Sequence, residues 1–387
     1  MQAAATYVDG EREMESSLPK LAKPLRILIA GGGTGGHIYP GIAIAREIRR
    51  RHPAVELLFV GTERGLEMKI VPAEGFRLET ITISGLKGTG LLKQLKSLLA
   101  IPKSLLDARR VLQRFQPSVV VGVGGYSSGP PVLMAALMGI PAMLQEQNAL
   151  PGLTNRLLAR VARKVATAFR ECEAYFGSKA VLTGNPVRAD FSHVPGRSGT
   201  DPFTLLVFGG SQGAQPINQS VIEAVAILKP QIQELKVIHQ TGEREYPRIK
   251  QAYEAMKMDA DVRPFFGDIP KQFAAADLLV CRAGATTLAE LTVSGKPAIL
   301  VPFPQAADDH QRRNAEALAQ AGAAEMILQK DLNGPALAAR IRYYFEHREE
   351  LRRMEHSSRA LGRPDATERI VDLVEELGGL RPAGLGV

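Results

Sequence analysis

His37 follows a glycine-rich stretch, residues 31–36 (GGGTGG), which separates an apolar run over residues 25–30 from an amphipathic run over residues 42–48. Glycines allow a ligand to approach the backbone closely, and amides at the start of a helix attract anions. An imidazole beside such amides can accept a proton near pH 7. The stretch therefore predicts a site for an anion or a sugar, with His37 as the first candidate for the catalytic base.

The same glycines leave a nucleotide cofactor open as an alternative. Gly31, Gly33 and Gly36 satisfy the dinucleotide fingerprint G-x-G-x-x-G. That fingerprint also needs an acidic residue at the end of the second strand, where it binds a ribose. Here Glu56 lies at the beginning of that strand, which ends in Val-Gly-Thr at residues 60–62. A nicotinamide-dependent oxidoreductase is therefore the weaker interpretation.

Two acidic residues, Glu146 and Glu290, are further candidates for a functional site. Glu146 and Asn148 come just after an apolar run, where the ligand edge of a parallel sheet is expected. A polar loop with a helix cap is the alternative interpretation, and Glu146 is our second candidate for the base. Glu290 lies early in a predicted helix, where it either complements the helix dipole or accepts the hydroxyl groups of a ribose.

Two motifs could bind a metal, but each has a simpler interpretation. Asp308, Asp309 and His310 can also form the acidic start of a helix. Asp259 and Asp261 match the D-x-D of metal-dependent glycosyltransferases, but they lie away from the glycine-rich loops. Those loops and nearby basic groups can neutralise a diphosphate alone, so we expect neither a metal nor another cofactor.

The elements that must position these residues alternate regularly between strand-like and helical runs. Such alternation predicts an α/β fold with parallel sheets covered by helices. Glycine-rich turns recur at residues 119–130 and 205–214, and a strand-glycine-helix unit opens near residue 26 and again near residue 204. We therefore expect two similar domains facing one another, with a boundary in the stretch 183–191, where Asn-Pro breaks regular structure.

Composition limits the classes of partner. The chain has 387 residues, a net charge of +8, two distant cysteines and no tryptophan. The positive charge suits acidic partners, but 5% aromatic residues and no nucleic-acid motif make nucleic acid the weakest of these. The polar start of the chain suggests no signal peptide, and no apolar stretch is long enough to span a membrane.

Residues 84–115 form a basic, leucine-rich segment with a single acid, Asp107. A helix with a solvated face is one interpretation, and a helix at a membrane surface is the other. The scarcity of acids keeps the second open. The basic residues concerned are Lys87, Lys93, Lys96, Lys103, Arg109, Arg110 and Arg114.

From about residue 25 to 375, the chain resembles the MurG family, which adds N-acetylglucosamine from UDP-GlcNAc to a lipid-linked muramyl-pentapeptide. The resemblance rests on seven motifs in family order: GGGTGGHIYP, GVGGYSSGP, QEQNALPGLTNRLLA, LTGNPVR, GGSQGAQPIN, CRAGATTLAE and VPFPQAADDHQRRNA. Each motif alone is weak, and the ordered set is specific. Two positions depart from the family pattern: Ala283 stands where serine is common, and Phe266 where a smaller aliphatic residue is common.

The resemblance implies a GT-B fold of two Rossmann-like domains facing a cleft. It places an N-terminal extension at residues 1–24, an acceptor and membrane-association domain at 25–187 and a UDP-GlcNAc-binding domain at 188–363. A last helix, about 364–380, would cross back onto the first domain.

It also implies which residues bind substrate. The first loop lines the cleft, Asn148 and Arg188 contact the donor, Ser211 meets the diphosphate, and Glu290 binds the ribose. The segment through Phe266 would flank the uracil through its backbone. The full expected set is Thr34, Gly35, Gly36, Tyr126, Asn148, Arg188, Ser211, Gln212, Asn218, Phe266, Ala285, Thr286, Thr287, Leu288, Ala289, Glu290, His310 and Gln311.

The implied reaction is an inverting transfer in peptidoglycan and cell-wall synthesis. The 4-hydroxyl of the muramyl sugar attacks the anomeric carbon of GlcNAc as UDP leaves. The expected partners are UDP-GlcNAc, undecaprenyl-pyrophosphoryl-MurNAc-pentapeptide and the anionic surface of the bacterial plasma (inner) membrane at its cytoplasmic face, where the protein would be peripheral. A UDP-GlcNAc 2-epimerase or a diacylglycerol glycosyltransferase of the same fold is the main alternative.

Overall fold

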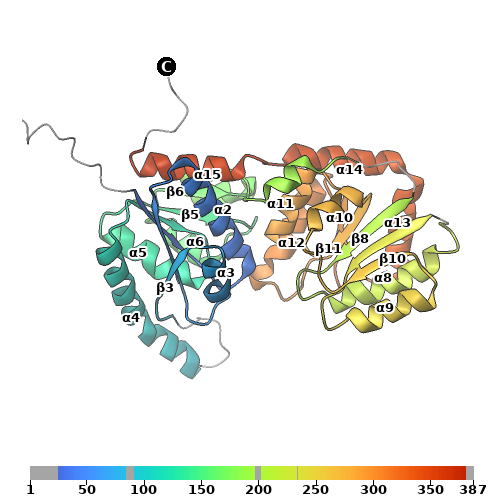
Figure 1. The fold of residues 1–387 in the computed structure, drawn as a ribbon, viewed down its shortest axis with the longest axis horizontal. Coiled ribbons are helices and arrows are strands. Elements are labelled where there is room, and N and C mark those ends of the chain that lie inside the picture. Colours follow the sequence, from blue (N-terminus) through green and yellow to red (C-terminus); the bar gives the residue numbers. More distant parts are fainter. Residues whose placement is uncertain (1–24, 84–90, 197–201, 233, 381–387) are drawn as a thin grey trace, which may run out of the picture.

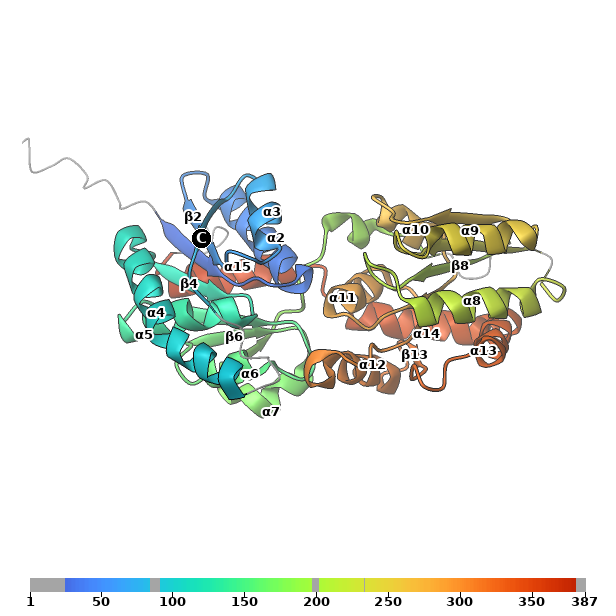
Figure 2. The ribbon, with the colours of Figure 1, turned by 90° about the horizontal axis from the view of Figure 1, so that it is seen from below.

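The computed structural model describes residues 25–83, 91–196, 202–232 and 234–380, with the side chains of residues 91–100 left out. The N-terminal extension and Lys87 therefore lie outside the described residues, as do the side chains of Lys93 and Lys96. Two α/β units lie side by side (Figures 1 and 2). The prediction of two parallel-sheet domains is confirmed.

The first sheet has seven parallel strands in the order β3-β2-β1-β4-β5-β6-β7. Its sequence alternates between its two faces. Ile27 and Ile29 of β1 pack toward α2, and Leu28 and Ala30 pack toward the opposite helical layer. The elements are β1 (Arg26–Ala30), α2 (Gly35–Arg51), β2 (Glu56–Gly61), α3 (Glu67–Ala73), β3 (Arg77–Thr80), α4 (Leu91–Phe115), β4 (Val119–Gly122), η1 (Tyr126–Ser128), α5 (Gly129–Leu137), β5 (Ala142–Glu146), α6 (Leu153–Leu158), β6 (Lys164–Thr167), η2 (Arg170–Cys172), α7 (Glu173–Phe176), η3 (Gly177–Lys179) and β7 (Ala180–Leu182).

The second sheet has six parallel strands in the order β10-β9-β8-β11-β12-β13. Leu205 and Val207 of β8 face a core that includes α8 and α13, and Leu206 and Phe208 face the core formed with α11 and α12. The elements are η4 (Ala189–His193), β8 (Phe203–Phe208), α8 (Gln215–Leu228), β9 (Leu235–Gln240), α9 (Tyr246–Ala255), β10 (Ala260–Arg263), α10 (Ile269–Ala275), β11 (Leu278–Cys281), α11 (Ala285–Ser294), β12 (Ala298–Leu300), η5 (Ala307–Asp309), α12 (His310–Gln320), β13 (Glu325–Met326), α13 (Gly334–Glu346) and α14 (Arg348–Leu361).

The last helix, α15 (Ala366–Leu377), returns to the first sheet and packs on α2 (Figure 1). Ile370 and Val374 enter the core beneath α2. Arg51 and His52, at the end of α2, both contact the buried carboxylate of Glu375. The chain therefore crosses between the domains twice, once after β7 and once after α14.

Helix α2 begins earlier than the amphipathic pattern suggests. The pattern is clear only over residues 42–48, but the helix starts at Gly35 and includes Pro40. The first N–H groups of this turn have no partner within the helix, so they can meet a ligand. As a result, His37 lies inside the first turn of α2 instead of before the helix.

Candidate active site between the two domains

The first two glycine-rich loops pack directly against each other. Gly124 has a φ of +97°, and a Cβ at this position would lie 2.6 Å from Nδ1 of His37. Gly125 has a φ of +78°, and its Cβ would lie 2.6 Å from the carbonyl oxygen of Gly32. Only glycine fits both the backbone conformation and the close approach at these positions. The loops after β1 and β4 thus meet beside His37.

The His37 ring is arranged as a neutral base. Its Nδ1 lies 3.2 Å from the carbonyl oxygen of Val123, which can only accept, so Nδ1 carries the proton and Nε2 keeps its lone pair. Burial lowers the pKa of His37, and the charge of His310 across the domain boundary acts in the same direction. Contacts with Val123 and Gln147 partly oppose this shift. The ring is therefore neutral near pH 7.

Glu146 holds a loop, and its environment does not suit a base. The carboxylate is 1% exposed at the end of β5. Its oxygens accept from the amides of Asn148 and Gly152, at 3.0 and 3.1 Å, and from the side chains of Asn148 and Asn155. Burial raises the pKa of Glu146, and these four donors oppose the rise. The Glu146 carboxylate is thus fully engaged within its own loop and fixes the position of Asn148.

Asn148 also connects the two domains. Asn314 of α12 donates from Nδ2 to Oδ1 of Asn148 and to the carbonyl oxygen of Ala283. Its Oδ1 accepts the backbone N–H of Ala149. Asn314 is fully buried. A substrate-side residue of the first domain is thus held by a helix of the second.

The other first-domain residues of the expected set lie at the surface near His37. Thr34 precedes α2 and is exposed, and its side chain makes no capping hydrogen bond. Gly36 is exposed and Gly35 half-buried in the first turn of α2. Tyr126 begins η1 directly after Gly125 and is 37% exposed. These positions leave backbone amides and two hydroxyl groups open to a ligand.

The third glycine-rich loop leads into the N-terminus of α8. Ser211 and Gln212 are both exposed in this loop. Gly213, with a φ of +71°, lies against the backbone of Thr241, and a Cβ there would overlap the Thr241 carbonyl oxygen. The close packing fixes the loop, and the helix start behind it is suited to an anion.

Glu290 and Arg188 face each other from different segments, 3.8 Å apart. The Glu290 side chain is 14% exposed and that of Arg188 is 51% exposed. Burial raises the pKa of Glu290 to about 7, and the positive charge of Arg188 opposes this rise. About half of the Glu290 side chains are therefore ionised at pH 7, beside the Arg188 cation.

The start of α11 leads to this pair. Ala285, Thr286 and Thr287 form its half-buried first turn, after Gly284 at the N-cap. Ala289 is half-buried, and Leu288 is only 1% exposed. The amides of the first turn can meet a ligand, but the Leu288 side chain belongs to the core.

His310 and Gln311 open helix α12 next to a strained turn. Asp308 and Asp309 have φ values of +53° and +55°, which are unfavourable for residues other than glycine. His310 is half-buried, and its Nδ1 contacts the carbonyl oxygen of Ala307. Gln311 accepts the backbone N–H of Phe303 at 3.0 Å. Helix α12 contacts the first domain through Asn314, which bonds to Asn148 and Ala149.

Burial limits what two residues of the expected set can offer a ligand. Asn218 is fully buried, and its amide is occupied by the Thr241 carbonyl oxygen and His239. It therefore supports the fold of α8 and offers nothing to a ligand. The Phe266 side chain is 2% exposed, and its N–H donates to Gln240. Only the Phe266 carbonyl oxygen is left to flank a base.

Glu67 is a site residue that sequence reasoning missed. Its carboxylate is 1% exposed and accepts the N–H of Gly33 at 2.8 Å, together with the N–H and hydroxyl of Thr62. A Cβ at Gly32, Gly61 or Gly65 would overlap this carboxylate. The glycines around Glu67 at positions 61 and 65 were a signal, but their contact with the first loop depends on the folded sheet.

The metal motifs do not assemble a site in the described part of the chain. Asp261 pairs with Arg263, and Asp259 lies 3.9 Å from Lys236, both at the edge strand β10. Within the described ranges no group of three His, Cys, Asp or Glu side chains is placed to hold a metal. Nor is any helix of those ranges long and apolar enough to cross a membrane.

Two family models match the chain. Residues 27–167 match the glycosyltransferase family 28 N-terminal domain, and residues 204–370 match the glycosyltransferase family 28 C-terminal domain. A protein of Anaeromyxobacter sp. (strain Fw109-5) is 51% identical over 367 residues, covering 93% of this chain and 96% of that protein. It is named UDP-N-acetylglucosamine–N-acetylmuramyl-(pentapeptide) pyrophosphoryl-undecaprenol N-acetylglucosamine transferase. A Myxococcus xanthus protein of the same name is 48% identical, covering 91% and 93% of the two chains.

Solved structures agree on the fold. The crystal structure of Acinetobacter baumannii MurG superposes with a TM-score of 0.78 at 30% identity, covering 91% of this chain and all of that one. A UDP-GlcNAc 2-epimerase from Neisseria meningitidis bound to UDP-GlcNAc has a TM-score of 0.63 at 13% identity, covering 91% of this chain and all of that one, which shows a shared fold alone.

Proposed function

The chain belongs to glycosyltransferase family 28, in its MurG branch, and on that premise we propose that it transfers N-acetylglucosamine from UDP-GlcNAc to the lipid-linked muramyl-pentapeptide. The observation that carries the proposal is the 51% identity to a transferase of that name over nearly the whole of both chains. Contacts between the domains support it, because Asn314 of α12 holds Asn148, and His310 of the same helix acts electrostatically on the neutral ring of His37. The family membership sets aside the oxidoreductase alternative.

In this proposal, His37 removes the proton from the acceptor hydroxyl. The oxygen then attacks the anomeric carbon of GlcNAc from the side opposite UDP, the bond to UDP breaks, and the configuration inverts. His37 Nε2 takes the proton, and the diphosphate takes the electron pair. A base within hydrogen-bond reach typically contributes about 10²–10⁴-fold to the rate. The Nδ1 contact with Val123 supports this role, because it leaves Nε2 as the acceptor.

The donor would lie against the second domain. Glu290 would accept the ribose hydroxyls, and Ser211 with the loop before α8 would meet the diphosphate. Negative charge grows on the diphosphate as the bond breaks, so amides at the starts of α8 and α11 would stabilise the transition state more than the ground state. The acceptor diphosphate would lie against the first loop and the start of α2, because Thr34 and Gly36 are exposed there.

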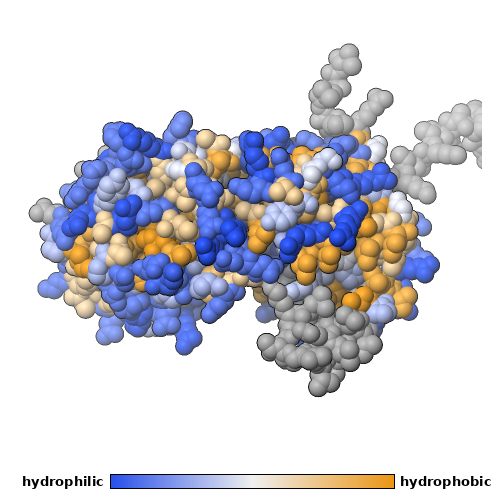
Figure 3. Space-filling view, turned by 180° about the vertical axis from the view of Figure 1, so that it is seen from behind, coloured by the Kyte–Doolittle hydropathy of each residue, from blue (hydrophilic) through white to orange (hydrophobic). Residues whose placement is uncertain are grey.

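The protein would dock on an anionic membrane surface through the first domain. An apolar groove lies between α4 and α5, with exposed Leu106 (52%) and Leu137 (69%). Lys103 and Arg109 of α4 are exposed beside it. Hydrophobic atoms gather on this domain in Figure 3. The groove, named here the α4–α5 groove, is lined by Pro102, Leu105, Leu106, Arg109, Met134, Leu137 and Met138.

UDP release tests the reaction. We expect the full chain to release UDP from UDP-GlcNAc only when the lipid-linked muramyl-pentapeptide is present, and to bind UDP but not NADH. Release of UDP at the same rate without the acceptor, or binding of NADH in place of UDP, would contradict the proposal.

A further inference from the structure

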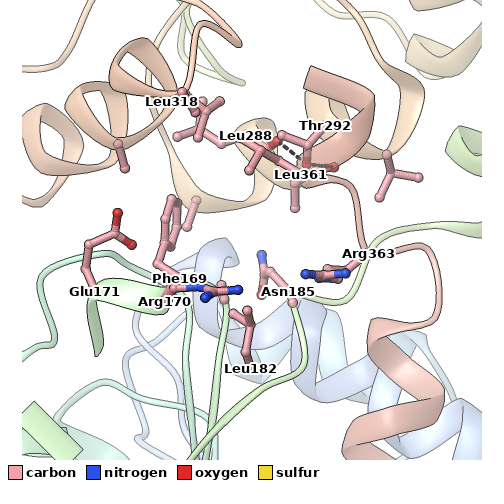
Figure 4. Close-up of a pocket in the computed structure, with 17 residues that line it drawn as sticks. Phe169, Arg170, Glu171, Leu182, Asn185, Leu288, Thr292, Leu318, Leu361 and Arg363 are labelled. Carbon is pink, nitrogen blue, oxygen red and sulfur yellow. Dashed lines mark hydrogen bonds between the residues drawn. The ribbon is translucent and has the colours of Figure 1, made fainter. Parts of the chain in front are cut away.

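A cavity separate from the α4–α5 groove lies where the chain crosses between the domains, and we call it the interdomain cavity. It has a volume of about 270 Å³. Its walls come from the loops after β6 and β7, from α11 and α12, and from the segment joining α14 to α15 (Figure 4). Both crossing segments therefore border it, through Asn185 in the first and Arg363 in the second.

The interdomain cavity lies on the side of α11 away from Glu290, although Ala285, Leu288 and Ala289 of the expected donor set also line it. Leu288 and Thr292 line the cavity, and each lies two residues from Glu290. Successive residues of a helix are about 100° apart, so both lie on the side opposite Glu290. His37, Ser211 and His310 do not line the cavity.

One end of the cavity holds a buried donor without a partner. Asn185 is 3% exposed, and its Oδ1 accepts from Gln145 at 2.9 Å. Its Nδ2 has no hydrogen-bond partner among the described residues and points into the cavity in Figure 4. A buried donor without a partner is costly, so this position favours an acceptor on an occupant.

Two cations flank the same donor. Figure 4 shows the guanidinium groups of Arg170 and Arg363 approaching Asn185 from opposite sides. Neither forms an ion pair with any described residue; Arg363 is half-buried, and Arg170 is exposed. The acid among the lining residues, Glu171, lies on the far side of Arg170 in the figure. Three donors thus converge on one end of the cavity.

The rest of the wall is apolar. Leu288, Val293 and Leu318 face the cavity from the second domain, and Leu182 and Leu361 from the other walls. An occupant that satisfies both ends has an anionic headgroup and a short apolar body. At about 270 Å³, the space suits a body of roughly six carbons with its headgroup.

We propose that the interdomain cavity is a binding site for a small amphipathic anion, a carboxylate or phosphate monoester on an apolar body. Its headgroup accepts from Asn185 Nδ2 and pairs with Arg170 and Arg363. Asn185 is joined to the catalytic loops through Gln145 and Gln147, and Gln147 Nε2 donates to the same Val123 carbonyl oxygen that His37 contacts. The occupant contacts both domains, so its binding is linked to their arrangement.

Ligand-observed NMR titrations test this with hexyl phosphate and hexanoate on the full chain, with saturating UDP present to occupy the donor surface. We expect binding of at least one anion at millimolar concentration or below, and none of hexanol or inorganic phosphate. Arg363→Gln should weaken it about tenfold, as the loss of a charged hydrogen bond does. Ala321→Phe should abolish it, because the exposed Ala321 lines the cavity and the new ring would fill it.

The matched control is Arg352→Gln, an exposed arginine of α14 outside the cavity, which should leave the affinity unchanged. The proposal is overturned if neither anion binds, if UDP displaces the probe, or if hexanol binds as tightly as the anions. It is also overturned if Arg363→Gln and Ala321→Phe, both folded by their thermal transitions, bind the probe like the parent.

Discussion

Asn314 of the second domain donates to Asn148 Oδ1 at 3.1 Å and accepts the N–H of Ala149 at 2.8 Å, so one buried asparagine joins the domains beside the candidate active site. Asn148 is held from the other side by Glu146. Its position therefore depends on both domains.

We expect Asn314→Leu, which keeps the size but removes all three side-chain hydrogen bonds, to lower kcat/KM at least tenfold. An unpaired buried group costs about 1–3 kcal/mol, and here that cost would fall on the arrangement of the domains. Steady-state kinetics and thermal unfolding measure the two effects separately. Gln320→Leu, at an exposed position at the end of the same helix, is the control. If Asn314→Leu has the kinetic parameters of the parent, its hydrogen bonds do not support activity.

His37→Ala should lower kcat by about a hundredfold or more, the scale of a positioned base. The affinity for UDP should change little, because in the proposed arrangement UDP lies against the second domain. The pKa of His37 is lowered, so activity of the parent should fall only below the ordinary histidine range, as the ring becomes protonated.

The pH profile separates this role from a structural one. The acidic limb assigned to His37 should be absent from the residual activity of His37→Ala. Glu146→Gln should instead raise KM and lower the unfolding temperature, because the carboxylate accepts from four donors. If Glu146→Gln loses the acidic limb and His37→Ala keeps it, Glu146 is the base.

Glu290 should make donor binding depend on pH. Its pKa is raised to about 7, and only the carboxylate accepts both ribose hydroxyls well. The affinity for UDP-GlcNAc should therefore fall as the pH drops below 7, approaching about tenfold per pH unit. Calorimetry between pH 5.5 and 8.5 (roughly the range that brackets this pKa) measures the trend. Glu290→Gln should bind weakly at every pH, and a pH-dependent Glu290→Gln would assign the trend to another group.

Ionisation of Glu290 should strengthen donor binding but lower the stability of the ligand-free protein. Because the folded pKa lies above the ordinary value of 4.5, the folded protein binds the proton more tightly than the unfolded chain does. Ionising Glu290 therefore costs stability as the pH rises from 4.5 to about 7. Substrate that contacts the carboxylate should offset that cost.

Glu67 should position the first loop. Burial favours a raised pKa, but the hydrogen bonds from Gly33 and Thr62 outweigh it and lower the pKa of Glu67. Its stabilising contribution is therefore present above the ordinary carboxyl range and is lost as the pH falls through the lowered pKa. Glu67→Gln would turn an N–H group toward a backbone donor and should cost about 1–3 kcal/mol of unfolding free energy.

The kinetic consequence distinguishes positioning from stability alone. Glu67→Gln should raise KM for the lipid acceptor more than KM for UDP-GlcNAc, because the first loop belongs to the acceptor side. Glu63→Gln, an exposed glutamate in the loop between β2 and α3, is the matched control. Equal changes in the two KM values would leave Glu67 with a purely structural role.

Much of this site followed from the sequence, for identifiable reasons. Glycine-rich turns after apolar runs mark the carboxyl ends of parallel strands, so the loops that carry His37 and Ser211 were expected at the facing edges of two sheets. Burial was harder to infer. Asn218 lies one helical turn from the third loop, and only the folded α8 shows that its amide faces His239.

Residues that act between distant segments were also missed. Glu67 is 34 positions from Gly33, and Asn314 is 166 positions from Asn148. Neither pair has a local spacing that indicates contact. Their roles depend on how β2 lies beside β1 and how the domains face each other, which no periodic pattern encodes.

Membrane association should be peripheral and sensitive to salt. Charge reversal of Lys103 and Arg109, which flank the α4–α5 groove, should weaken binding to anionic vesicles and leave UDP affinity unchanged. Each basic residue near such a surface contributes about 1 kcal/mol, and salt screens the attraction. Vesicle sedimentation measures it, with Arg352→Glu and Arg353→Glu on α14 as the control pair. Equal binding of the parent to neutral and anionic vesicles would contradict an electrostatic contribution.

The fate of the sugar tests the central claim most directly. UDP-GlcNAc labelled in the sugar is incubated with the full chain and the lipid-linked muramyl-pentapeptide, and the label is followed in the lipid, nucleotide-sugar and free-sugar fractions. The account predicts that label enters the lipid fraction, as a β-linked disaccharide, at a rate that rises with acceptor concentration. Label that leaves the donor without an acceptor, or that accumulates as a 2-epimer of the nucleotide sugar, would contradict it.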